Sequence, residues 1–128
     1  MSDRLCVDTG PLIMHLRAGR GTTSPLAQLG QDPEIVISAI SVAELWQGAR
    51  PMEGAATQAL VDLCTVVPVD EATARSAGGL VASCRARRLV LGLPDALVAA
   101  TALVLHAPLW TTNAKDFAAV EGLAVLPL

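Results

Sequence analysis

Residues 93–117 read LPDALVAATALVLHAPLWTTNAKDF, and this stretch decides the fold. The segment 94–105 is almost wholly apolar apart from Asp95, which is typical of a helix buried on all sides. After a break at a proline, residues 109–111 predict a short buried strand, and a helical turn follows that contains Asp116. The stretch therefore predicts a buried helix that leads into a strand, with one acid at the start of the helix and another beyond the strand.

The composition is that of a compact protein. Of the 128 residues, 52% are hydrophobic and only 16% are charged, which predicts one globular domain over residues 1–128. A net charge of −3 gives no general attraction for nucleic acid, so any RNA contact needs a local basic patch. Cys6, Cys64 and Cys84 follow no metal-binding or redox spacing, and we expect them to be buried thiols in a reducing compartment. No secretory signal is visible, and the longest apolar run is too short for a bilayer; this predicts a cytoplasmic protein without membrane contact.

Apolar runs and helical segments alternate along the whole chain. Strands are expected at 5–7, 35–37, 66–69, 109–111 and 123–126. Helices are expected at 12–18, 22–29, 41–49, 54–64, 70–88, 94–105 and 112–117. This alternation predicts an α/β fold of three layers, in which helices cover both faces of a parallel sheet of about five strands. Right-handed crossovers and one reversal of winding predict the strand order 3-2-1-4-5, with the strand that contains Pro68 at an edge.

The predicted topology sorts the acidic residues by position. Five acids follow a strand, or begin a helix that leads into one, and therefore belong to the carboxyl edge of the sheet: Asp8, Glu44, Asp70, Asp95 and Asp116. Asp70 follows the outer third strand, whereas the other four surround the point where the strand order reverses, which is where open α/β sheets bind ligands. Because four carboxylates without a cationic partner need a hard cation, the sequence predicts a Mg²⁺ or Mn²⁺ site.

Each of these positions also has a purely structural interpretation. Glu44 could complete a capping box with Ser41, and Asp116 could form a similar cap with Asn113. Asp95 could interact only with the helix dipole, and Asp8 could belong to an ordinary strand-to-helix turn. The neighbouring polar side chains could likewise cap helices or position a ligand or hydrated metal: Thr9, Thr112 and Asn113.

Four motifs follow one another along the chain: VDTGPLI at 7–13, ISVAEL at 40–45, LPDALVAATA at 93–102 and TTNAKDF at 111–117. Taken together, they resemble the motifs of one known family, the PIN-domain ribonucleases. Their order and the chain length are similar to those of VapC-type toxins of bacterial toxin–antitoxin pairs. This chain departs from the family pattern at Gly10, where the family more commonly has serine, and in its small number of lysines.

The resemblance implies specific roles for the acids and specific partners. Asp8 and Asp95 would be the principal Mg²⁺ ligands, and Glu44 and Asp116 would complete the acidic set. It further implies cleavage of RNA, often tRNA or ribosomal RNA, and a homodimer inhibited by a small antitoxin. A metal-bound water would attack the phosphodiester, and arginines would hold the RNA backbone. The candidate arginines are Arg17, Arg20, Arg50, Arg85, Arg87 and Arg88, although the last three could simply be a solvated helix end.

Two other functions compete with this hypothesis. A phosphoacceptor receiver domain would use Asp70, Thr111 or Thr112, and Lys115. Such domains are marked by a pair of acids after the first strand, whereas here Asp8 stands alone. An inert module could bind RNA or protein without cutting, against which the complete acidic set argues. Independently of function, the large aliphatic content predicts a homodimer through the helices between Thr22 and Cys64.

Overall fold

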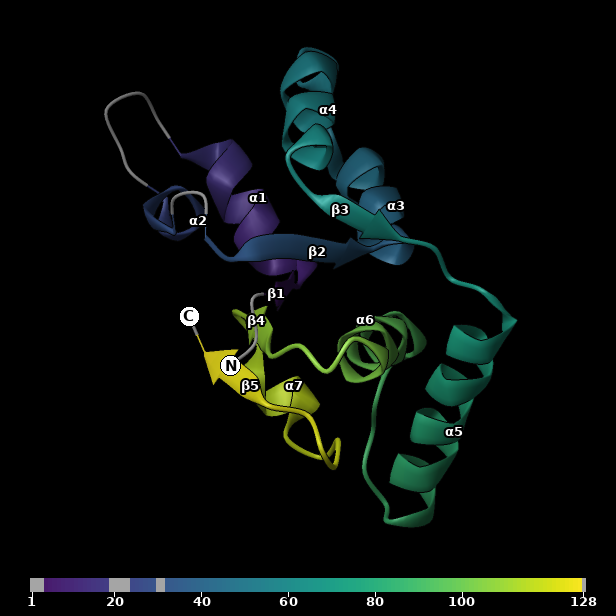
Figure 1. Cartoon of the computed structure of the whole chain (residues 1–128). Coiled ribbons are helices and arrows are strands. Elements are labelled where there is room, and N and C mark those ends of the chain that lie inside the picture. The colour runs from purple at the N-terminus through teal and green to yellow at the C-terminus, as the bar shows by residue number, and fades with distance from the viewer. Residues whose placement is uncertain (1–3, 19–23, 30–31, 128) are drawn as a thin grey trace.

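Five parallel strands form one sheet in the order β3-β2-β1-β4-β5, as predicted (Figure 1). The structure is a computed structural model that describes residues 4–18, 24–29 and 32–127. The strands are β1 (Arg4–Val7), β2 (Glu34–Ser38), β3 (Thr65–Val67), β4 (Leu109–Thr111) and β5 (Val125–Pro127). Cys6 of the central strand β1 is in register with Val36 on one side and Leu109 on the other. The reversal of winding therefore lies between β1 and β4.

Seven helices of the described residues connect and cover these strands. They are α1 (Thr9–Arg17), α2 (Pro25–Gln28), α3 (Ala39–Gly48), α4 (Gly54–Asp62), α5 (Glu71–Ala86), α6 (Leu93–Val104) and α7 (Ala114–Phe117). Figure 1 shows α1 to α4 on one side of the sheet and α5 to α7 on the other. Helices cover both faces, as the alternating sequence predicted.

Side chains of β1 enter two separate hydrophobic cores because successive residues of a strand point to opposite faces. Leu5 and Val7 pack with residues of α1, α3 and α4, whereas Cys6 packs with residues of α5, α6 and α7. Helix α6 buries Ala96, Val98, Ala99, Ala100, Thr101 and Ala102, which confirms the prediction of a buried helix. These small side chains bring the backbone of α6 close to the sheet, and this fixes the first turn of the helix at the sheet's carboxyl edge.

Several element boundaries differ from the predicted ones. Helix α1 begins at Thr9 rather than at residue 12, because Asp8 caps it directly and a proline is tolerated in its first turn. Helix α2 is only a single turn from Pro25, and residues 22–23 of its predicted range lie outside the described residues. Strand β3 ends at Val67, just before Pro68, and pairs only with β2, which confirms its edge position.

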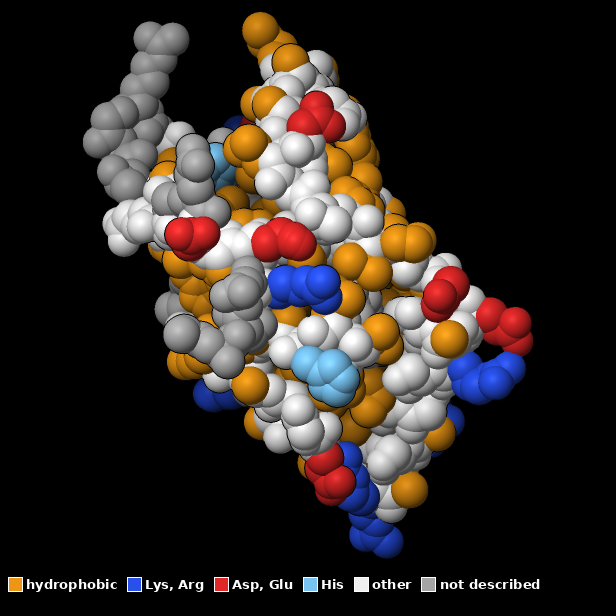
Figure 2. All heavy atoms as spheres, viewed as in Figure 1, with side chains coloured by type: hydrophobic (Ala, Val, Ile, Leu, Met, Phe, Trp, Pro, Cys, Tyr) orange, Lys and Arg blue, Asp and Glu red, His pale blue; other side chains and the backbone are white. Residues whose placement is uncertain are grey.

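Large hydrophobic side chains remain exposed on the outer surface of the helices. Figure 2 shows them over α4 and the region around β3. Met52 is 96% exposed and Leu63 is 78% exposed, and Trp46 on α3 is also exposed. Among the described residues, no helix has the length and apolar character needed to cross a membrane.

Candidate active site

Asp8 is held rigidly at the end of β1. Its side chain is buried, and its Oδ1 accepts a hydrogen bond of 2.8 Å from the backbone N–H of Thr9. Its Oδ2 accepts a second bond of 2.8 Å from the hydroxyl of Thr111, at the end of the neighbouring strand β4. Each oxygen keeps a further lone pair, so the carboxylate can still bind a cation while its orientation is fixed.

Glu44 reaches the same region from α3. Its Oε1 accepts a hydrogen bond of 2.7 Å from the hydroxyl of Thr9. The alternative interpretation of Glu44 as part of a capping box with Ser41 is wrong, because α3 is capped one turn earlier by Ser38, whose hydroxyl accepts from the N–H of Ile40. Ser41 is instead buried inside the helix, where its hydroxyl lies 3.1 Å from that of Thr9. Glu44 is therefore free of any capping function, and the pair of hydroxyls links α3 to the end of β1.

Asp95 lies in the first turn of α6. The pKa of its carboxyl is raised to about 6, mainly by burial and in addition by the negative charges of Asp8, Asp116 and Glu44. The carboxyl of Asp95 is therefore repelled by each of the other three acids. The N-terminus of the helix favours a carboxylate, but here that effect is outweighed by burial and by repulsion between like charges.

A single cleft of about 390 Å³ opens at this edge of the sheet. Its lining residues are Asp8, Thr9, Gly10, Ile13, Glu44, Gln47, Gly48, Asp95 and Asn113. Asp8, Glu44 and Asp95 therefore share one cavity, whereas Asp116 is exposed on α7 and does not line it. Of the predicted supporting residues, Thr9 and Asn113 line the cleft, and Thr112 is exposed beside it.

The donor set of this cleft fits a hard divalent cation. Its charged side chains are all carboxylates, and its polar side chains are hydroxyls and amides, the oxygen ligands that Mg²⁺ and Mn²⁺ prefer. Within residues 4–18, 24–29 and 32–127, no three acidic, histidine or cysteine side chains are drawn together tightly enough to hold a metal as they stand. Chelation by all three carboxylates thus requires at least one of them to move toward the others.

Comparison with known proteins identifies the family of this chain. The chain matches the PIN domain over residues 5–123. The chain belongs to the PIN-domain family. Ribonuclease VapC10 of Mycobacterium tuberculosis is 35% identical over 119 residues, which cover 93% of this chain and 90% of that protein. Ribonuclease VapC19 of the same organism is 35% identical over 112 residues, which cover 87% of this chain and 90% of that protein. A toxin–antitoxin complex from Klebsiella pneumoniae has a chain that superimposes with a TM-score of 0.77 at 27% identity over 95% of both chains.

Three residues at the site of this PIN domain were not predicted from the sequence to belong to it. Thr111 was considered only as part of a receiver site, whereas it holds Asp8. Ser41 was interpreted as a cap, and Gln47 was not considered although it lines the cleft. The spacing of Gln47, three residues after Glu44 on α3, places both side chains on one helix face and could have indicated it.

Of the arginines proposed to hold RNA, those within the described residues do not line the cleft of the PIN domain. Arg17 forms an ion pair with Glu53 and lies near the cleft, beside a smaller cavity to which Glu44 also contributes. Arg87 donates a hydrogen bond of 2.8 Å to the carbonyl of Ala119. Figure 2 shows basic side chains at the C-terminal end of α5, where Arg85, Arg87 and Arg88 lie. Arg50 is exposed after α3, and Arg20 lies outside the described residues. Their role in RNA binding stays a prediction.

Asp70 does not belong to the site of the PIN domain. It caps α5, where its carboxylate accepts a hydrogen bond of 2.8 Å from the N–H of Thr73. This bond lowers the pKa of Asp70, and the residue is exposed. A receiver-like phosphoacceptor needs this aspartate in the ligand site, so its capping position argues against that function.

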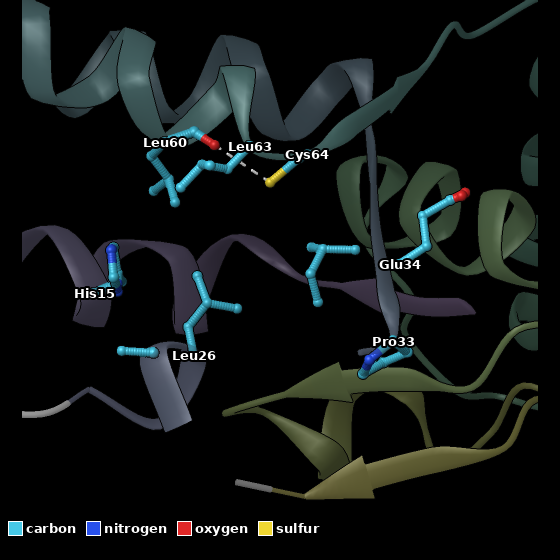
Figure 3. Close-up of a pocket in the computed structure, with 9 residues that line it drawn as sticks. His15, Leu26, Pro33, Glu34, Leu60, Leu63 and Cys64 are labelled. Atoms are coloured by element: carbon cyan, nitrogen blue, oxygen red, sulfur yellow. Dashed lines mark hydrogen bonds between the residues drawn. The ribbon is translucent and has the colours of Figure 1, made fainter. Parts of the chain in front are cut away.

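A second cavity, of about 380 Å³, lies away from the acids, and its lining is mostly apolar (Figure 3). Figure 3 shows that Leu26, Leu60 and Leu63 from α2 and the end of α4 face the cavity. His15, which shares a hydrogen bond of 2.6 Å with Ser24, closes one end. The lining of this second cavity differs chemically from that of the acidic cleft, because no cluster of acids contributes to it.

Proposed function

We propose that this chain is a Mg²⁺- or Mn²⁺-dependent endoribonuclease that hydrolyses RNA phosphodiester bonds. The observation that carries the proposal is the cleft shared by Asp8, Glu44 and Asp95 at the reversal point of the sheet. Relatives at 35% identity over most of the chain are named ribonucleases, which supports the same reaction here.

Asp8, Glu44 and Asp95 would hold the cation, with Asp116 adding negative charge nearby. When bound, Mg²⁺ or Mn²⁺ supplies activation of a water molecule and neutralisation of charge on the phosphoryl group. The other residues of the site orient these ligands. Thr9 fixes Glu44, and Thr111 fixes Asp8, so two of the three carboxylates are oriented in advance.

The cleft also has to accept a negatively charged polymer. Asp8, Glu44 and Asp95 repel phosphate, so RNA binding requires the cation to reverse the local field. Away from the carboxylates, the side-chain amides of Gln47 and Asn113 offer hydrogen-bond donors to the substrate. Hydrolysis then adds water across one P–O bond, and one product keeps the phosphate.

We further propose that the chain is the toxin of a toxin–antitoxin pair and acts on tRNA or ribosomal RNA in the cytoplasm. The VapC names of its relatives and its likeness to the Klebsiella pneumoniae toxin–antitoxin complex support a small inhibitory partner. Expression of the wild type should arrest growth, and co-expression of the product of an adjacent short gene should relieve the arrest. Arrest by Asp8→Asn at equal expression would contradict this role.

A homodimer is part of the same proposal. Trp46, Met52 and Leu63 are exposed hydrophobic side chains on α3, α4 and the turn between them, within the region predicted from sequence. Burial of such a patch against a second copy removes apolar surface from water. Sedimentation at micromolar concentration should give twice the monomer mass, and a monomer alone would refute the proposal.

The reaction is tested with purified protein and total cellular RNA. We expect cleavage in Mg²⁺ or Mn²⁺, loss of cleavage in EDTA, and recovery when the cation is added back. Asp8→Asn should abolish cleavage. Asp70→Asn is the matched control, since Asp70 belongs to the same edge of the sheet but caps a helix outside the cleft, and it should leave cleavage intact. Cleavage that resists EDTA, or full activity of Asp8→Asn, would overturn the proposal.

A further inference from the structure

Gly10 leaves room for the side chain of Thr112. A Cβ atom added to Gly10 would lie 2.2 Å from Oγ1 of Thr112 and 3.3 Å from its Cβ. Real Cβ atoms do not approach an oxygen that closely, so any other residue at position 10 would displace the hydroxyl. The backbone of Gly10 does not adopt a positive φ. Space, and not backbone conformation, therefore explains the glycine.

The hydroxyl of Thr112 lies at the margin of the acidic cleft. Gly10 and Asn113 both line the cleft, and Thr112 contacts the first and directly precedes the second. Thr112 is exposed, and its Oγ1 packs against Gly10, a residue of the cleft lining.

The other hydroxyls around the site already have partners. The hydroxyl of Thr9 donates to Glu44, and that of Thr111 donates to Asp8. Within the part of the chain that the structure describes, the hydroxyl of Thr112 makes no hydrogen bond. The cleft is rich in carboxylates, which only accept hydrogen bonds, and phosphate oxygens also only accept. A free hydroxyl at the margin is therefore one of few neutral donors that a phosphate could use.

We propose that Thr112 is a substrate-binding residue whose hydroxyl donates a hydrogen bond to a phosphate oxygen of RNA, and that Gly10 is required to make room for it. This inference rests on the proposed ribonuclease function. Two positions far apart in sequence, in the first and the last of the four motifs, would thus act as one unit.

The binding test uses the Asp95→Asn background, in which cleavage should be blocked, and a fluorescein-labelled single-stranded RNA of mixed sequence in Mn²⁺. Thr112→Val removes the hydroxyl at nearly constant shape and should weaken binding about tenfold, the effect expected for one hydrogen bond to a charged group. Thr112→Ser keeps the hydroxyl and should bind as the background does. Gly10→Ala should produce the same loss as Thr112→Val, and the two changes together should be no worse than either alone.

A transfer of the hydroxyl gives the sharpest test. In Gly10→Ser/Thr112→Ala, the new Cβ lies 2.2 Å from the position that Oγ1 of Thr112 leaves, so a serine rotamer can return a hydroxyl to this region and binding should recover relative to Thr112→Ala. Gly79→Ala is the control for a glycine replacement as such, because a Cβ there meets no atom within 4 Å and the residue lies within α5. It should leave RNA binding unchanged.

The outcomes separate this inference from the ribonuclease proposal. If the wild type cleaves RNA while Thr112→Val binds RNA normally, the role of Thr112 is refuted and the ribonuclease proposal stands. If the wild type neither binds nor cleaves RNA, both are refuted. Melting temperatures test the steric part alone: Gly10→Ala should be better tolerated in a Thr112→Ala background than in the wild type, and equal effects in the two backgrounds would refute it.

Discussion

The hydroxyl of Thr111 donates a hydrogen bond of 2.8 Å to the carboxylate of Asp8, a residue 103 positions earlier in the chain. Both residues lie at the carboxyl ends of the paired strands β1 and β4, and both are buried. The bond therefore orients a candidate metal ligand through a neighbouring strand, and its strength affects both folding and metal binding.

Thr111→Val should lower the free energy of unfolding by about 1–3 kcal/mol, because it leaves a buried carboxylate short of one donor. Mn²⁺ affinity should fall by about 10- to 100-fold, as is usual when a residue that orients a metal ligand is lost. Thermal melting and calorimetric Mn²⁺ titration measure the two effects. Thr111→Ser retains the hydroxyl and should preserve Mn²⁺ affinity; equal affinities for the valine variant and the wild type would contradict this role.

Asp95→Asn should make the metal-free protein more stable at pH 7, by about 1 kcal/mol after allowance for solvent screening of this half-buried group. It removes a charge that is buried and repelled by Asp8, Asp116 and Glu44. The stabilisation that the wild type gains from Mg²⁺ or Mn²⁺ should shrink at the same time. Melting curves in EDTA and in Mn²⁺ give both quantities.

The alternative interpretation of Asp95 gives the opposite result. If Asp95 only interacted with the dipole of α6, its replacement by asparagine would slightly lower stability and leave the metal response unchanged. Asp70→Asn serves as the control, because Asp70 is such a capping residue. It should lower the melting temperature and leave the stabilisation by Mn²⁺ intact.

The stability of the metal-free protein should decrease as the pH rises from about 4 to about 6. Asp95 has a folded-state pKa of about 6 against 3.8 for the ordinary group, so the folded protein binds more protons than the unfolded chain between these values. The stabilisation from protonated Asp95 is fully present below the pKa of the unfolded chain and is lost as the pH rises through the pKa of the folded protein. Urea unfolding in EDTA across this range should show the decrease, and Asp95→Asn should remove it.

The pKa of Asp70 is lowered, so its contribution to stability has the opposite sign and is lost only as the pH falls below the ordinary aspartate range. The two groups therefore act in different pH windows. A wild-type stability that stays flat between pH 4 and 6, and matches that of Asp95→Asn throughout, would contradict the shift assigned to Asp95.

Thr57→Val should stabilise the protein by about 1 kcal/mol, because it replaces a buried hydroxyl without a partner by a methyl group of similar size. The side chain of Thr57 is fully buried on α4, and its Oγ1 makes no hydrogen bond among the described residues. Chemical denaturation measures the change. A lower stability would show that the hydroxyl has a partner, for which the adjoining cavity of about 30 Å³ has room as a single water molecule.

The sheet could be predicted because buried parallel strands are short apolar runs and because at least one helix separates each strand from the next. The acids could be predicted because topology alone assigns residues after a strand to the carboxyl edge. Asp8 and Asp95 could be assigned to this edge without any knowledge of their side-chain contacts.

The detailed contacts could not be predicted, since they depend on positions that differ by one to three residues. Thr111 and Thr112 are adjacent, and successive residues in a strand point to opposite faces, so only the register of β4 decides which one reaches Asp8. Ser38 and Ser41 are both plausible caps, and only the true start of α3 selects Ser38. The exposed position of Asp116 likewise depends on how the short helix α7 leaves the sheet.

The central position of β1 also affects how the chain can fold while it is being synthesised. β1 pairs with β2 on one side and with β4 on the other, and about 100 residues separate β1 from β4. At ordinary rates of translation, roughly 5–20 s pass between the appearance of the two strands, and one edge of β1 stays unpaired in that interval. Asp95 and Thr111 emerge from the ribosome only at the end of this interval. The nascent chain therefore cannot assemble the acidic cleft until residue 111 has left the ribosome.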